Sequence, residues 1–200
     1  MVRLTQITTR GGDCGQTSLG DGQRVSKASL RIEALGTVDE ANASIGVARL
    51  YMSGAEEDSI LADIQNDLFD LGADLCIPYA TEGEESTLRV TGQQVEQLES
   101  ATHAVNATLP HLNSFVMPHG TPAATHLHMA RTIVRRAERC VVALDKHEAI
   151  NPNGIVYLNR LSDFLFVLAR LMNDSKGDED LWQPGQGTGH SPPKSTRDIG

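Results

Sequence analysis

The chain has 200 residues and a formal net charge of −9, with a hydrophobic content of 40% and an aromatic content of only 4%. This length predicts one domain, or at most two, with a hydrophobic core, and the low aromatic content favours helices over a β-sandwich. The negative charge argues against a general nucleic-acid-binding protein. A local basic patch in so acidic a chain would instead indicate a small anionic ligand.

The cysteines indicate a reducing compartment. Cys14, Cys76 and Cys140 are odd in number and form no C-x-x-C pair, so they predict neither a disulfide framework nor a zinc site. The N-terminus has no apolar signal core, and no run of about 18 apolar residues occurs. We therefore expect a cytoplasmic protein without a membrane segment.

Residues 5–29 form a glycine-rich segment that we expect to be a loop. The segment contains five glycines, several hydroxyl side chains and the basic residues Arg10, Arg24 and Lys27. Glycine lets a backbone approach a ligand closely, and successive backbone N–H groups can surround a phosphate. The Walker signature G-x-x-x-x-G-K-[ST] is absent, and on composition alone a flexible N-terminal arm is an equal alternative.

Apolar residues at intervals of three and four predict three helices after this loop. They are expected at about 31–52, 58–75 and 91–107. Asp39 and Glu40 lie outside the apolar stripe of the first helix. Pro110 and Pro118 bracket a following loop that contains Phe115.

Two more helices are predicted in the second half of the chain. Thr121 followed by Pro122 is typical of an N-cap and a first helical position, and this helix is expected to end near residue 147. Residues 151–154 (Asn-Pro-Asn-Gly) are a turn signal, and a fifth helix is expected over about 155–173. Five helices with short links and no convincing strand predict an all-α bundle.

The expected domain ends before the C-terminus of the chain. We assign residues 1–184 to a single helical domain that includes the glycine-rich loop. Residues 185–200 are rich in Gly, Pro, Ser and charge, and are expected to be a disordered tail.

The fourth helix has two chemically different faces. With Arg131 at 0° and 100° per residue, Arg135, Glu138 and Arg139 fall at roughly 40°, 340° and 80°. The apolar residues fall on the other side, between roughly 200° and 320°: Leu127, Ala130, Ile133, Val134, Ala137, Val141 and Leu144. Guanidinium groups bind planar oxyanions through a fork of donors, so this arginine wall suits a polyphosphate. The alternative is an ordinary solvated charged face.

The remaining polar residues favour anion binding over proton transfer. On the fifth helix Asn159, Asp163 and Arg170 form one polar stripe. His126 and His128 point about 200° apart, so they cannot share a metal ion, and the other histidines are expected at the surface or in caps. The Glu-x-x-His motifs of a di-iron bundle are absent. The inventory is therefore suited to binding and positioning an anion.

Five motifs, in order, give the chain a family resemblance. They are Thr9-Arg-Gly-Gly-Asp13-x-Gly-x-Thr17, Arg24-x-x-Lys27, Glu33-Ala-x-Gly36-Thr-Val-Asp39-Glu40, Arg131-Thr-x-x-Arg135-Arg-Ala-Glu-Arg139 and Leu158-Asn159-Arg-Leu-Ser-Asp163-Phe-Leu-Phe. Over about residues 5–184 the chain resembles the PduO-type ATP:cob(I)alamin adenosyltransferases. Five motifs in sequence are a highly specific match.

The resemblance implies a fold, a reaction and an assembly. It implies a five-helix, ferritin-like bundle that forms a homotrimer with ATP in clefts between subunits. The reaction transfers the 5′-deoxyadenosyl group of ATP to the cobalt of cob(I)alamin and releases tripolyphosphate, with Mg²⁺ required. A corrinoid, a reductase and an adenosylcobalamin-dependent enzyme are the implied partners. A non-catalytic ATP-sensing or cobalamin-delivery module is the alternative.

The resemblance also implies the site residues. The nucleotide-binding positions map onto Thr9, Arg10, Gly11, Gly12, Thr17, Ser18, Lys27, Arg135, Arg136, Ala137, Glu138, Arg139 and Asn159. Gly11 departs from the threonine that is common in the family, so only a backbone contact is expected there. The ligands of Mg²⁺ are not identified.

Four residues are expected to have catalytic roles. Arg135 and Arg139 hold the phosphates, and Asp39 orients an arginine of the wall, which we take to be Arg135 of a neighbouring subunit. Phe115 covers the lower face of the corrin, where it excludes the axial ligand and eases reduction of Co(II). The alternative for Phe115 is a ring that simply covers the core.

Overall fold

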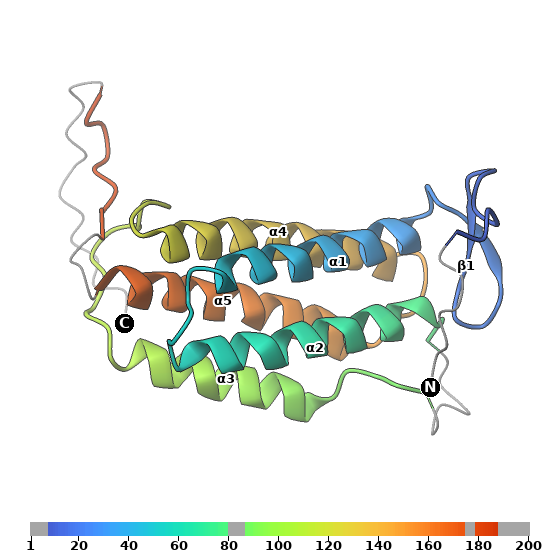
Figure 1. The fold of residues 1–200 in the computed structure, drawn as a ribbon, viewed down its shortest axis with the longest axis horizontal. Coiled ribbons are helices and arrows are strands. Elements are labelled where there is room, and N and C mark those ends of the chain that lie inside the picture. Colours follow the sequence, from blue (N-terminus) through green and yellow to red (C-terminus); the bar gives the residue numbers. More distant parts are fainter. Residues whose placement is uncertain (1–7, 80–86, 175–178, 188–200) are drawn as a thin grey trace.

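The computed structural model describes residues 8–79, 87–174 and 179–187. Within them the chain forms an elongated bundle of five helices, as predicted (Figure 1). The helices are α1 (Leu30–Arg49), α2 (Glu57–Cys76), α3 (Gly92–Asn106), α4 (Pro122–Asp145) and α5 (Pro152–Asp174). α4 packs on both α1 and α5, while α2 packs on α1 and α3 packs on α5. None of the described helices is long and apolar enough to cross a membrane.

Side-chain caps set where three of the helices begin. The Ser29 hydroxyl accepts a hydrogen bond from the backbone N–H of Ile32 at the start of α1. Thr91 forms a reciprocal capping box with Gln94 at the start of α3. Thr121 caps α4, with Pro122 at the first helical position as predicted. These groups satisfy backbone N–H groups that have no partner within the helix.

The apolar face predicted for α4 forms the centre of the core. Of the seven residues predicted for this face, Ile133 is half-buried and the other six are fully buried. Buried alanines recur at seven-residue intervals on both α1 and α4: Ala34, Ala41 and Ala48, and Ala123, Ala130 and Ala137. Because alanine is small, these positions allow the two helix backbones to pack closely.

Two sequence expectations about local structure were wrong. Helix α5 begins at Pro152 rather than near residue 155, because Asn151 accepts a hydrogen bond from the Asn153 backbone N–H and Pro152 suits the first helical position. The glycine-rich segment also contains two short antiparallel strands, β1 (Gln16–Ser18) and β2 (Arg24–Ser26). Three-residue strands are too short for the alternating pattern by which strands are recognised.

A short pairing that the sequence analysis did not anticipate lies at the C-terminal end of the described chain. Residues 179–182, which we call the C-terminal strap, run antiparallel to residues 115–117 through a bridge between Val116 and Leu181. The strap meets the loop before α4 at the end of the bundle opposite β1 (Figure 1). Of the tail predicted at 185–200, residues 188–200 lie outside the described part of the chain.

Candidate functional site

Arg135 and Arg139 of the arginine wall line an open pocket of about 420 Å³ on the surface of α4 and α5. Lys146 and Asn159 also line it, together with Glu138. Both arginines are exposed, and Arg139 donates a hydrogen bond from one Nη to the Arg135 carbonyl oxygen at 3.1 Å. The pocket therefore presents three cationic side chains beside one carboxylate, an arrangement suited to a polyphosphate.

Asn159 joins the wall from the neighbouring helix. Its Nδ2 donates a hydrogen bond to Oε1 of Glu138 at 3.0 Å, and Arg160 donates to its Oδ1 at 2.8 Å. The nitrogen and the oxygen of the Asn159 amide are thus both hydrogen-bonded, which fixes the orientation of the side chain. The sequence placed Asn159 and Glu138 on different helices, and the structure brings them into direct contact.

The other members of the arginine motif have different environments. Arg136 forms an ion pair with Glu40 of α1, and the Ala137 side chain is fully buried. Arg131 is half-buried, and its Nε has no hydrogen-bond partner among the described residues. Burial lowers the pKa of Arg131, and the nearby charge of Arg135 lowers it further. Arg135 and Arg139 are therefore the members best placed to bind a ligand.

The described part of the glycine-rich segment is a β-hairpin beyond the N-terminal end of α1 (Figure 1). Arg24 lies across the hairpin and donates hydrogen bonds to the Gly11 carbonyl oxygen at 2.7 Å and to the Ser18 hydroxyl at 3.2 Å. The Lys27 ammonium lies against Gly12, where a Cβ would come within 2.8 Å of Nζ. Gly12 therefore allows the ammonium group to lie beside the backbone.

The hairpin and the arginine wall are separate within one chain. A hydrogen bond from the Gly20 N–H to the Cys76 carbonyl oxygen joins the hairpin to the end of α2. Thr9 and Arg10 are exposed, as are Gly11 and Ser18, and Thr17 is half-buried in the hairpin. None of the described hydrogen bonds joins these residues to Arg135 or Arg139, and their shared nucleotide site stays a prediction.

Asp39 also lies apart from the arginine wall. It is exposed on α1 beside a groove of about 310 Å³ between α1 and α2, lined by small and apolar residues that include Gly36, Phe69 and Gly72. Phe69 is strongly exposed, at 69%. Within the described chain Asp39 has no hydrogen bond or ion pair, so its predicted arginine partner is not met in the monomer.

Phe115 lies at the far end of the bundle from the hairpin. It lines an apolar pocket of about 390 Å³ with Leu112, Ser114 and Phe166, and its ring is 76% exposed. The Trp182 ring lies 6.0 Å from it, centroid to centroid, and is tilted by 57°. So exposed a side chain covers little of the core within the described chain.

The chain matches proteins of known family along most of its length. The sequence model of the cobalamin adenosyltransferase family matches residues 7–172. The chain belongs to the cobalamin adenosyltransferase family. It is 47% identical over 187 residues to the corrinoid adenosyltransferase of Mycobacterium tuberculosis, covering 92% of this chain and 96% of that protein. The cobalamin adenosyltransferase of Cupriavidus metallidurans is 48% identical over 184 residues, with 90% and 96% covered.

Solved structures of the family agree with the fold. A variant PduO-type ATP:corrinoid adenosyltransferase from Lactobacillus reuteri, complexed with cobalamin and ATP, matches with a TM-score of 0.84 at 34% identity, covering 90% of this chain and 97% of that one. Another variant of that enzyme, complexed with ATP, gives a TM-score of 0.81 at 35% identity, with 89% and 100% covered.

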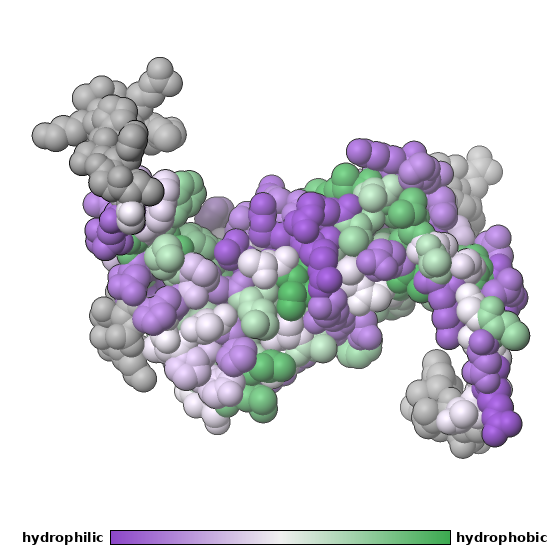
Figure 2. Space-filling view, turned by 90° about the horizontal axis from the view of Figure 1, so that it is seen from above, coloured by the Kyte–Doolittle hydropathy of each residue, from purple (hydrophilic) through white to green (hydrophobic). Residues whose placement is uncertain are grey.

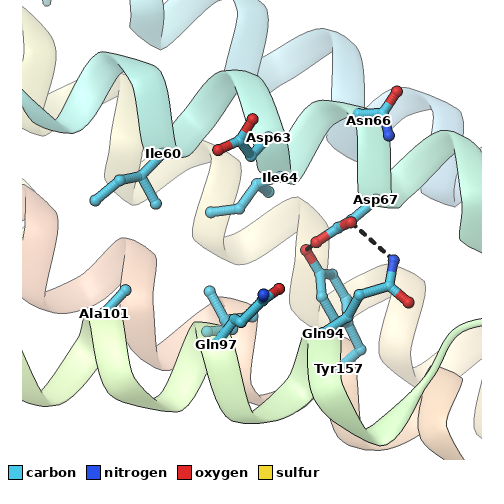
Figure 3. A pocket seen from close by; sticks show the side chains of 10 residues that line it. Ile60, Asp63, Ile64, Asn66, Asp67, Gln94, Gln97, Ala101 and Tyr157 are labelled. Atoms are coloured by element: carbon cyan, nitrogen blue, oxygen red, sulfur yellow. Dashed lines mark hydrogen bonds between the residues drawn. The ribbon is translucent and has the colours of Figure 1, made fainter.

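A further cavity of this family member, about 460 Å³, does not suit the nucleotide. It lies between α2 and α3 over Tyr157 of α5 (Figure 3). The Tyr157 hydroxyl and the Gln94 amide each donate to Asp67 at 2.8 Å, and burial raises the pKa of Tyr157. Asp63 also lines the cavity. These carboxylates would repel a polyphosphate.

His128 is a buried polar residue that sequence reasoning missed in this adenosyltransferase fold. It is only 2% exposed, and neither ring nitrogen has a partner in the described structure. Burial and the charge of Arg131 lower the pKa of His128 to about 4, against the opposing effect of Glu179. The helical angle places His128 on the arginine side of α4, but the Phe166 ring of α5 lies 6.3 Å away and helps to bury it. No local sequence signal indicates that Phe166 buries His128.

Proposed function

We propose that the chain is an ATP:corrinoid adenosyltransferase, which moves the 5′-deoxyadenosyl group of ATP to the cobalt of cob(I)alamin and releases tripolyphosphate. The observation that supports it most directly is the pocket of Arg135, Arg139 and Asn159 in a chain of this family. The relatives solved with cobalamin and ATP support the same reaction.

The chemistry requires little proton transfer from the protein. The electron pair of Co(I) attacks C5′ of ATP, the Co–C bond forms, and the C5′–O bond breaks as tripolyphosphate leaves. Arg135, Arg139 and Lys27 stabilise the negative charge that develops on the leaving group. Backbone groups of Gly11 and Gly12, with Thr9, Arg10, Thr17 and Ser18, contribute the remaining contacts to the phosphates.

The residues of the pocket also fit a magnesium ion bound with the nucleotide. Mg²⁺ is usually held by one or two carboxylates together with substrate phosphates and water. Glu138 is the carboxylate that lines the arginine pocket, and only its Oε1 is used by Asn159. When bound, Mg²⁺ supplies positive charge that offsets the charge of the phosphates. We therefore propose Glu138 as the protein residue that would hold this ion.

Three copies of the chain are proposed to complete the site as a trimer. Helix α4 rises about 1.5 Å per residue, so Arg139 lies about 26 Å along it from Pro122, and Phe115 lies beyond that start. The hairpin lies at the other end of the bundle (Figure 1). ATP and the corrin must meet at bonding distance, which favours a site built from the arginine wall of one subunit and residues of its neighbour.

The face made by α1 and α4 suits such an assembly. Figure 2, which looks onto this side of the molecule, shows a hydrophilic band across its middle with hydrophobic patches beside it. The groove between α1 and α2 holds unpartnered Asp39 next to exposed Phe69. A second copy that covers Phe69 would bring its own arginine wall to the Asp39 carboxylate. We propose that Arg135 of that copy is the arginine that Asp39 contacts.

Phe115 is proposed to act on the corrin and not on ATP. Its exposed ring and apolar pocket suit the flat lower face of the corrin. A ring at that face excludes both the axial base of the cofactor and water. Loss of the axial donor lowers the electron density on Co(II), so its reduction to Co(I) becomes easier.

The cellular setting follows from the same chemistry. Cys14, Cys76 and Cys140 are all free thiols, which supports the cytoplasm as the compartment. A reductase must supply the electron that converts Co(II) to Co(I), and an adenosylcobalamin-dependent enzyme would use the product.

A single experiment tests the proposed reaction. The purified chain is incubated anaerobically with MgATP and cob(I)alamin, and the absorbance change on Co–C bond formation is followed. Stoichiometric tripolyphosphate is the second product to be measured. ATP binding without either change would instead identify a sensor or delivery module.

A further inference from the structure

We propose that the C-terminal strap sets the position of Phe115, with Trp182 as a positioning residue for Co(II) reduction. This inference rests on the role proposed for Phe115 and goes beyond it, because it assigns a function to a segment outside the five helices. Trp182 acts through Phe115 and needs no contact of its own with the corrin.

Backbone hydrogen bonds join the strap to the Phe115 loop on both sides of the ring. The Trp182 N–H donates to the Phe115 carbonyl oxygen at 2.7 Å, and the Met117 N–H donates to the Asp180 carbonyl oxygen at 2.8 Å. The Ser114 hydroxyl donates to the Trp182 carbonyl oxygen at 2.6 Å. In the described part of the chain, these hydrogen bonds tie residues 114–117 to the strap.

A buried arginine anchors the loop and the strap together. Arg170 of α5 is 3% exposed, and its Nε donates to Oε1 of Glu179 at 2.8 Å. The same guanidinium donates through Nη2 to the Pro110 carbonyl oxygen at 2.8 Å and to Glu179 Oε2 at 3.3 Å. One planar group thus fixes the first residue of the strap relative to the start of the loop.

The two aromatic rings complete the arrangement. Phe115 is 76% exposed and Trp182 is 46% exposed, although the strap holds both in place. Their tilted contact at 6.0 Å is the geometry that aromatic pairs prefer. Exposed Leu112 and Met117 extend the apolar surface around them. Such an apolar patch indicates a binding surface, and Trp182 limits the directions in which the Phe115 ring can turn.

The consequence is specific to the Co(II) substrate. A Phe115 ring that is free to turn would exclude the axial ligand only part of the time. Removing the Trp182 ring should therefore reduce the population of Co(II) that has lost its lower ligand, while the arginine wall continues to bind ATP. An aromatic contact of this kind corresponds to an effect of roughly three- to tenfold.

The test uses the full-length chain with MgATP and cob(II)alamin, read by electron paramagnetic resonance, which separates four-coordinate from five-coordinate Co(II). Trp182→Ala should lower the four-coordinate fraction roughly three- to tenfold, and should lower turnover from Co(II) by the same factor when a chemical reductant is added to supply the electron. The KM for ATP should stay near that of the wild type. Trp182→Phe, which keeps an aromatic ring, should keep most of the four-coordinate Co(II) fraction of the wild type. Leu88→Ala, which removes an exposed apolar side chain elsewhere, is the control.

Three further variants separate the possible outcomes. Glu179→Gln leaves both rings in place but weakens the anchor, and should lower the four-coordinate fraction in the same direction. In a Phe115→Ala background, Trp182→Ala should have no further effect, because Trp182 acts through Phe115. If Phe115→Ala alone leaves the Co(II) reaction unchanged, the role proposed for Phe115 fails. If Phe115→Ala impairs it and Trp182→Ala does not, or if the two effects add, the strap proposal is overturned.

Discussion

Asn159 and Glu138 are joined by a hydrogen bond of 3.0 Å that links α5 to α4 at the floor of the arginine pocket. This bond holds the one carboxylate of the pocket, so that its second oxygen remains available for a cation bound with the nucleotide. Asn159 and Arg139 line the same pocket. The pocket is thus defined by two helices rather than by the arginine motif alone.

The first prediction concerns Arg139. Arg139→Ala should raise the apparent ATP constant about tenfold or more, or abolish turnover, because a charge-assisted contact to the phosphates is lost. Steady-state kinetics with varied MgATP measures it. Arg49→Ala is a suitable control, because Arg49 pairs with Asp58 on another part of the surface. An unchanged ATP constant with normal turnover would remove Arg139 from the site.

Asp39→Asn should reduce activity more than it reduces helicity. The substitution keeps the shape of the side chain but removes the charge that would orient the arginine of a neighbouring subunit. Turnover measures activity, circular dichroism measures helicity, and sedimentation velocity on the same samples measures the oligomeric state. Lost helicity in proportion to lost activity would contradict the prediction, as would a trimer structure with Asp39 far from every arginine.

The glycine-rich segment should become protected when MgATP binds. Arg10, Arg24 and Lys27 are exposed in the unliganded chain and are trypsin sites, whereas Arg31 is buried at the start of α1. Ordering of residues 5–27 over the nucleotide, of which 5–7 lie outside the described residues, should slow cleavage at the three exposed sites. Mass spectrometry of timed digests identifies each cut. Equal rates with and without MgATP would count against this role.

Phe115→Ala should leave the ATP constant nearly unchanged. Turnover should fall sharply when the assay starts from Co(II) and less when Co(I) is supplied, because only the first requires removal of the axial ligand. Thermal unfolding of the same variant is the control, and an exposed ring predicts little change in Tm. A variant that melts, or that loses ATP binding alone, would show that Phe115 is structural.

His128 predicts a dependence of stability on pH. Its pKa is about 4 in the folded chain and about 6.5 when unfolded. Between these values only the unfolded state binds the proton, so the unfolding free energy falls as the pH falls from 6.5 to 4. The loss has an upper limit on the order of 3 kcal/mol. Denaturant unfolding at several pH values measures it.

The variant for this measurement is His128→Gln, which is polar but does not titrate. Between pH 6.5 and 4 the unfolding free energy of this variant should fall less than that of the wild type. His103→Gln, at an exposed position, should show the same fall as the wild type. The same pH dependence in wild type and His128→Gln would show that the imidazole is not held neutral.

The helices could be predicted from sequence because their signals are local. The angles on α4 separate Ala130, Val134 and Ala137 from Arg135 and Arg139, and the structure buries the first set and exposes the second. The family motifs also singled out Asn159, which lines the arginine pocket, and its role toward the nucleotide stays a prediction. The role of Asp39 could be predicted only through the family resemblance, and it stays a prediction.

The features that were missed depend on contacts between distant segments. The strap pairs Leu181 with Val116, and nothing near either residue indicates that they meet. Arg170 was assigned to a polar stripe, but it is buried because Glu179 and the Pro110 carbonyl satisfy its donors. Arg136 was placed with the nucleotide, and its partner Glu40 lies on another helix.

The alanines on α1 and α4 have a consequence for how activity can be lost. Small buried alanines determine how α1 and α4 are aligned along their axes. They are Ala34, Ala41 and Ala48 on α1, and Ala123, Ala130 and Ala137 on α4. A bulkier side chain at one of them would shift one helix against the other. Such a shift would move Arg135 relative to Asp39, so small buried side chains inside one bundle would determine the alignment of the proposed site between subunits.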